Sequence, residues 1–84
     1  MTSAIEIARD NGLATDYLDP VSPRGNCPGF NLYVCDVEGT LQLIAADYPG
    51  SAELRVAFRF GGEVRSIELL GPNPDKITWL SARH

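Results

Sequence analysis

Apolar and polar residues alternate with a period of two through much of the chain from Phe30 onward. Residues 30–37 and 41–43 follow this pattern, which is typical of half-buried strands because successive side chains point to opposite faces of a sheet. Glu38-Gly39 lies between the two runs and has the composition of a tight hairpin turn. We therefore expect a β-hairpin whose second strand ends near Asp47.

The longest alternating run covers residues 53–60, where one set of apolar side chains would share a face: Leu54, Val56, Phe58 and Phe60. Turn-forming pairs flank this run, Pro49-Gly50 before it and Gly61-Gly62 after it. A two-residue loop at Gly61-Gly62 fits a hairpin that continues into residues 64–70. The pattern thus predicts a third and a fourth strand, with Phe58 buried in the core.

Helix signals mark both ends of the chain. Ser3 and Glu6 have the spacing of a capping box, and Gly12 suits the left-handed residue that ends a helix. Near the other end, Asn73 followed by Pro74 is typical of a helix start, whereas the β-branched residues after them favour a strand. We favour the helix and keep a fifth strand as the alternative.

These elements together predict a single small globular domain of the α+β class over residues 1–84. It would be a four-stranded antiparallel β-meander with a short N-terminal helix and a short C-terminal helix or fifth strand. We expect Trp79 and Leu80 to dock on the sheet.

The segment Asp36-Val37-Glu38-Gly39-Thr40 resembles the Asp-x-Asp-Gly-Thr box of haloacid dehalogenase phosphatases, whose two carboxylates act as nucleophile and acid/base. That family also needs a much longer, doubly wound sheet, a later lysine and further acidic residues for magnesium. Lys76 is the single lysine of this chain, and the second carboxylate is a glutamate. Because a hairpin turn explains Gly39, we assign no phosphatase activity.

Other reactive residues are too few to build a catalytic or metal site. The single histidine, His84, is the last residue, and chain ends are rarely well ordered. Cys27 and Cys35 have no further cysteine or positioned histidine to complete a zinc site. We expect Cys35 to be a small core residue and leave open whether it pairs with Cys27. The sequence therefore predicts no enzyme, no metal and no cofactor.

The charge of the chain is distributed unevenly around a formal net charge of −4. Residues 1–50 hold seven acidic and two basic side chains, whereas residues 51–84 hold four acidic and five basic ones. Nucleic-acid binders normally carry a basic excess that neutralises phosphates, so we expect no direct nucleic-acid binding. A net charge of a few units is explained by solubility alone. The more specific interpretation is that the acidic surface binds a protein partner with a basic surface.

The sequence also bears on location. No apolar run approaches the ~20 residues that a membrane span requires, and residues 1–6 lack the basic and apolar regions of a secretory signal. We therefore expect a cytoplasmic protein without membrane contact. The sequence leaves its oligomeric state open.

The function that we expect is a non-enzymatic protein-binding module. It would be a small acidic stoichiometric inhibitor of a basic nucleic-acid-handling protein, as virus-encoded inhibitors of bacterial defence systems are. The alternative is an immunity-like or antitoxin-like protein, or an accessory subunit of a larger assembly. The candidate partner-binding residues are acidic and would lie at the rim of the sheet: Asp16, Asp19, Asp36, Glu38 and Asp47. The next candidates form an apolar patch on the second sheet face: Tyr33, Val37 and Ile44.

Overall fold

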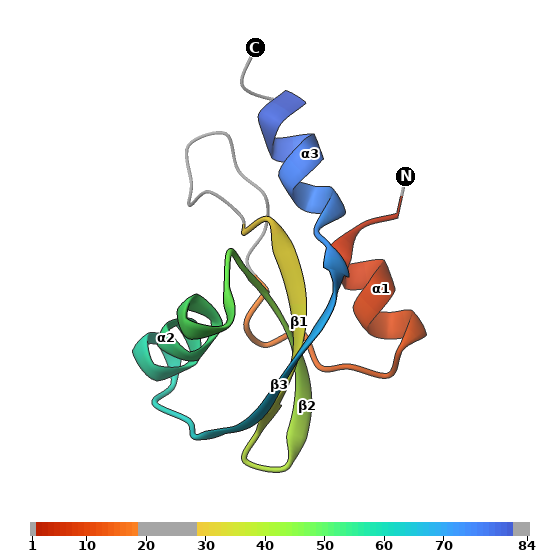
Figure 1. The fold of residues 1–84 in the computed structure, drawn as a ribbon. Helices are drawn as coiled ribbons and strands as arrows, with labels where there is room; N and C mark the ends of the chain where they lie inside the picture. Colours follow the sequence, from red (N-terminus) through yellow and green to blue (C-terminus); the bar gives the residue numbers. More distant parts are fainter. Residues whose placement is uncertain (1, 19–28, 82–84) are drawn as a thin grey trace.

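The computed structural model describes residues 2–18 and 29–81 and has an α+β architecture (Figure 1). Its elements in chain order are α1 (Ala4–Asp10), β1 (Asn31–Val37), β2 (Thr40–Ala46), α2 (Pro49–Arg59), β3 (Val64–Pro72) and α3 (Pro74–Ser81). The strands form one antiparallel sheet in the order β2-β1-β3. Within the described ranges, no helix is long and apolar enough to cross a bilayer.

The hairpin of β1 and β2 is confirmed. The two strands pair without interruption from Val37 opposite Thr40 to Asn31 opposite Ala46. The pairing of β1 with β3 shifts register at two points, each of which leaves an extra residue in β3. Bulges of this kind bend and twist an edge strand, which discourages pairing with another chain.

The N-terminal helix is also confirmed, because local capping fixes both of its ends. The Ser3 Oγ accepts a hydrogen bond from the Glu6 N–H at 3.3 Å. After the helix, the N–H of Leu13 donates to the Ala8 carbonyl at 2.8 Å, and Gly12 has a φ of 67°. This is a Schellman motif, and it returns Leu13 to pack beside the helix.

The sheet is buried on both faces because α1 and α2 lie on opposite sides of it (Figure 1). The α1 side holds one core cluster: Ala4, Ala8, Leu32, Leu43 and Ala45. The α2 side holds the other: Tyr17, Tyr33, Cys35, Val37, Ile44, Ala46, Ala52 and Val56. Alternate residues of β1 and β2 therefore serve two different cores, as the period of two requires.

The strand that we expected over residues 53–60 is wrong, because α2 (Pro49–Arg59) occupies this segment. Pro49 begins the helix instead of a turn, and Gly61-Gly62 connects α2 to β3 instead of closing a hairpin. Val56 is fully buried against the sheet, whereas Phe58 is 84% exposed. The second sheet face needs a cover, and a helix supplies one, so tertiary burial overrides the local alternation.

The C-terminal segment forms helix α3, so a fifth strand is excluded. Asn73 precedes it as a cap, and its Oδ1 accepts a hydrogen bond from the Asp75 N–H at 3.0 Å. The expected docking of Trp79 and Leu80 on the sheet is not what the structure has, because α3 extends beyond the end of the sheet (Figure 1). Trp79 is buried beside Lys76, whose Nζ lies 4.8 Å from the indole centroid, and Leu80 is 47% exposed.

Candidate functional site

The candidate site lies at the tip of the β1–β2 hairpin, at the opposite end of the sheet from α3 (Figure 1). Glu38 and Gly39 both have positive φ, at 53° and 95°, as the two central residues of a type I′ turn do. Asp36 accepts a hydrogen bond from the Gly39 N–H through its Oδ1 at 2.7 Å. The Asp36 carboxylate therefore stabilises the turn, and the Glu38 carboxylate lies at its exposed tip.

The tip is joined to the segment that leads into β3. The N–H of Glu38 donates to the Glu63 carbonyl at 3.1 Å, so the two acidic residues are neighbours. Gly62 makes this approach feasible, since a Cβ there would lie 2.9 Å from Val37 Cγ1 and 3.2 Å from Glu38 Oε2. Any larger residue at this position would push the two segments apart.

An aromatic pair adjoins these carboxylates. The rings of Tyr17 and Phe60 meet edge to face with their centroids 5.2 Å apart. Tyr17 is buried, whereas Phe60 is 63% exposed, and the Arg59 guanidinium lies 5.4 Å from the Phe60 ring centroid. Because a Cβ at Gly62 would also lie 3.5 Å from the Tyr17 hydroxyl, the aromatic pair and the hairpin tip form one continuous surface.

Asp16 is tied to Gln42 of β2. The Gln42 Nε2 donates to Asp16 Oδ2 at 2.7 Å, and the Asp16 N–H donates back to Gln42 Oε1 at 3.3 Å. Gln42 is only 5% exposed, so its amide needs these partners. We call the set formed by Asp36, Glu38, Phe60 and Glu63 the hairpin end.

Asp47 does not belong to the hairpin end. It follows β2 at the other end of the sheet, and the seven residues of that strand span about 20 Å at about 3.3 Å per residue. Its Oδ1 accepts a hydrogen bond from the Phe30 N–H at 3.0 Å, and its N–H donates to Ser51 Oγ at 3.3 Å. Asp47 therefore anchors the start of β1 and the first turn of α2. Asp19 lies outside the described residues.

The structure thus places two of the five candidate acids, Asp36 and Glu38, at the hairpin tip. It ties Asp16 to Gln42 and places Asp47 at the other end of β2. Sequence reasoning missed Glu63 and Phe60, because it placed Phe60 on an inward strand face. The two consecutive glycines, Gly61 and Gly62, were the available signal for a chain reversal near the tip. The alternative apolar patch of Tyr33, Val37 and Ile44 is wrong, since all three are buried under α2.

Cys35 has the core role that we expected. It is a free cysteine with no exposed surface, and it packs in the cluster beneath α2. Burial raises the pKa of its thiol to about 11, and the negative charge of Glu53 adds to this effect. Such a thiol is a poor nucleophile at neutral pH because the thiolate is the reactive form. Cys27 and His84 lie outside the described residues.

The remaining geometry offers no metal centre within the part of the chain that the structure describes, where no three ligand-type side chains group together. Comparison with protein-family models, with curated proteins and with solved structures gives no match to this chain.

Proposed function

We propose that the chain is a non-enzymatic protein-binding module, and that its hairpin end binds a basic surface of a nucleic-acid-handling protein as a stoichiometric inhibitor. Glu38 and Glu63 offer charge, and the exposed ring of Phe60 offers an apolar contact next to it. Interfaces commonly combine an aromatic anchor with charged groups at its rim. Carboxylates in this arrangement match arginine and lysine side chains that would otherwise hold phosphates.

One observation supports this proposal above the others, the left-handed conformation of Glu38. Its φ of 53° lies where residues other than glycine, asparagine and aspartate are disfavoured by about 1 kcal/mol. Asn-Gly is the preferred sequence for such a turn. A glutamate kept there at a conformational cost is a feature of the kind that functional sites carry. We infer that the Glu38 carboxylate is used in binding.

The test is affinity capture from a bacterial lysate, followed by mass spectrometry, with three forms of the purified protein as bait. The first is the wild type, and the second carries Glu38→Lys with Glu63→Lys. The third is a charge-matched control, Asp10→Lys with Glu68→Lys, which changes two exposed residues outside the hairpin end. All baits are first checked for equal folding by circular dichroism.

The proposal predicts that the wild type and the control capture the same basic protein in a one-to-one ratio, and that the hairpin-end variant does not. Capture of that protein by all three baits would contradict a role for the hairpin end. A captured protein that keeps its nucleic-acid binding when saturated with the wild type would contradict inhibition.

A further inference from the structure

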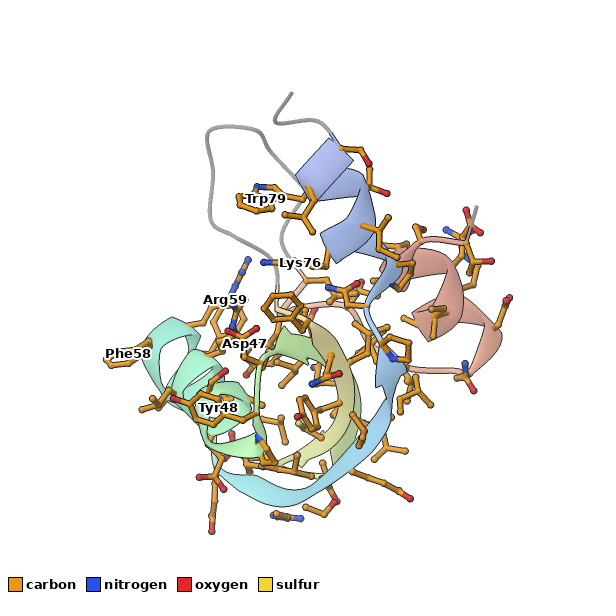
Figure 2. All side chains as sticks on the ribbon, turned by 45° about the horizontal axis from the view of Figure 1, so that its top comes forward. Asp47, Tyr48, Phe58, Arg59, Lys76 and Trp79 are labelled. Carbon is orange, nitrogen blue, oxygen red and sulfur yellow. The ribbon has the colours of Figure 1, made fainter. Side chains whose placement is uncertain are left out.

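Helix α2 is apolar on two opposite faces. Val56 is fully buried toward the sheet, whereas Leu54 is 51% and Phe58 84% exposed. At about 100° per residue, Leu54 and Phe58 point about 160–200° away from Val56, which is the side remote from the sheet. Figure 2 shows Phe58 projecting outward from α2. A helix with an apolar outer face normally has that face covered.

The outer apolar face runs the length of the helix. Gly50 lies one helical turn before Leu54, and a Cβ on it would lie 3.2 Å from Cε2 of the Tyr48 ring. The ring of Tyr48, itself 58% exposed, thus lies close against the first turn. We call the surface formed by Tyr48, Leu54 and Phe58 the α2 stripe.

We propose that the α2 stripe is a self-association surface, covered by the α2 of a second copy in the same direction about a two-fold axis. Gly50, Leu54 and Phe58 follow a single ridge spaced by four residues. Such a ridge can pack into the groove beside the same ridge of another helix, and this is the commonest helix packing in globular proteins. The Tyr48 ring, which lies against Gly50, extends this ridge at the N-terminal end of the helix.

Charge decides the direction of the two helices. Arg55 lies on one flank of the stripe and Glu53 on the other. In an antiparallel two-fold pair each flank faces its own copy, so Arg55 would face Arg55. In a parallel pair opposite flanks face each other, so each Arg55 approaches Glu53 of the second copy. The parallel arrangement therefore makes two favourable pairs where the antiparallel arrangement makes a repulsive one.

The exposed area sets the strength of the contact. Aromatic side chains bury about 150–250 Å² each, so the exposed fractions of Tyr48, Leu54 and Phe58 amount to about 350 Å² per copy. A standard interface buries about 800 Å² per partner. The dimer is therefore a weak, reversible one that forms as concentration rises.

The arrangement has a consequence for binding. The α2 helix runs toward the hairpin end, since its C-cap residue is Phe60. Parallel α2 helices thus place both hairpin ends on the same side of the dimer. Two hairpin ends on one side can engage a partner with repeated basic sites, which raises avidity. The self-association itself does not depend on the function proposed for the hairpin end.

Sedimentation equilibrium of the purified chain, without any partner, tests the proposal between about 10 μM and about 1 mM, the range expected of a small interface. The apparent mass should rise from the 9.1 kDa of one chain toward twice that value. Phe58→Ser should raise the dissociation constant at least about a hundredfold, because both copies lose a buried ring. Ile77→Ser on α3 is the control, because Ile77 is also exposed (59%) but lies outside both the α2 stripe and the hairpin end, and it should leave the dissociation constant unchanged.

Charge exchange tests the direction. Arg55→Glu alone should weaken the dimer, because it places like charges together, and the double variant Glu53→Arg with Arg55→Glu should restore it. A wild type that stays at 9.1 kDa throughout overturns the proposal, as does self-association that Phe58→Ser leaves unchanged. A double variant as weak as Arg55→Glu overturns the parallel arrangement. None of these results involves the hairpin end, so the proposed function is tested separately.

Discussion

Asn73 joins the start of α3 to Gly29, two residues before β1, because its Nδ2 donates a hydrogen bond to the Gly29 carbonyl at 2.9 Å. Its Oδ1 accepts from the Asp75 N–H at 3.0 Å, and its own N–H donates to the Phe30 carbonyl at 2.8 Å. Asn73 is only 3% exposed. The Asn73 side chain therefore caps α3 through its oxygen and bonds a carbonyl near the start of β1 through its nitrogen. This double role requires a side chain with both an acceptor and a donor.

Replacing Asn73 tests this double role. Asn73→Ala should lower the free energy of unfolding by about 2–3 kcal/mol, since the helix cap is lost and the Gly29 carbonyl loses its partner. Asn73→Asp keeps an acceptor for the Asp75 N–H but has no N–H to donate to Gly29, so it should also destabilise at neutral pH. Urea unfolding measures both variants. A loss below about 0.5 kcal/mol for Asn73→Ala would contradict the bridging role.

Two apolar positions of α2 should respond very differently to truncation. Val56→Ala should lower the free energy of unfolding by about 1–3 kcal/mol, because Val56 is fully buried between α2 and the sheet. Phe58→Ala should change it by less than about 0.5 kcal/mol at low protein concentration, because Phe58 is 84% exposed. Equal losses, measured by urea unfolding, would instead support a strand with both side chains inward.

Local chemistry accounts for the parts of the fold that the sequence predicted. The β1–β2 hairpin follows from Glu38-Gly39, and α1 and α3 follow from their capping residues Ser3, Gly12 and Asn73. The segment 53–60 misled because its alternating apolar residues serve two different helix faces. Val56 points to the sheet, whereas Leu54 and Phe58 point away from it. Pro49 at the first helical position and the Ala, Glu, Leu and Arg that follow were the helix signals.

The part of the candidate site that local sequence defines could be predicted, and the part that depends on the path of the chain could not. Asp36 and Glu38 belong to a turn that local sequence defines, so their neighbourhood could be inferred. Asp47 was grouped with them although it lies at the opposite end of β2, because turn residues were assumed to share one rim. Glu63 reaches Glu38 only through the path of the chain between α2 and β3. No local pattern encodes that path once α2 is taken for a strand.

The buried thiol of Cys35 makes stability depend on alkaline pH. Its pKa is raised to about 11, above the 9.0 of an unperturbed thiol. The unfolded chain therefore loses this proton first as pH rises. The contribution of the protonated Cys35 thiol to the free energy of unfolding is fully present below pH 9.0. It decreases between pH 9.0 and about pH 11, by up to about 1.4 kcal/mol per pH unit.

Cys35→Ala isolates this contribution from the lysine and tyrosine residues that titrate in the same range. Urea unfolding at several pH values should give a steeper alkaline loss for the wild type than for the variant. Parallel curves between pH 9 and pH 11 would show that the thiol does not remain protonated in the folded state.

Glu38→Asn should separate stability from binding. Asparagine tolerates the left-handed conformation, so the free energy of unfolding should rise by about 0.5–1 kcal/mol. The same change removes a carboxylate from the hairpin end and should weaken binding to the basic partner. Thermal unfolding measures the first effect. A variant that is less stable than the wild type would contradict the type I′ geometry of the turn.

The most direct test of the binding role is calorimetry of the captured basic protein against the wild type and the Glu38→Lys, Glu63→Lys variant, at low and at high salt. Charges at a solvent-exposed rim are screened beyond about 8 Å at physiological ionic strength, so the wild-type affinity should fall as salt increases. The variant should bind at least about tenfold more weakly at low salt and show a smaller salt dependence. Equal affinities for both proteins under both conditions would contradict binding through the hairpin end.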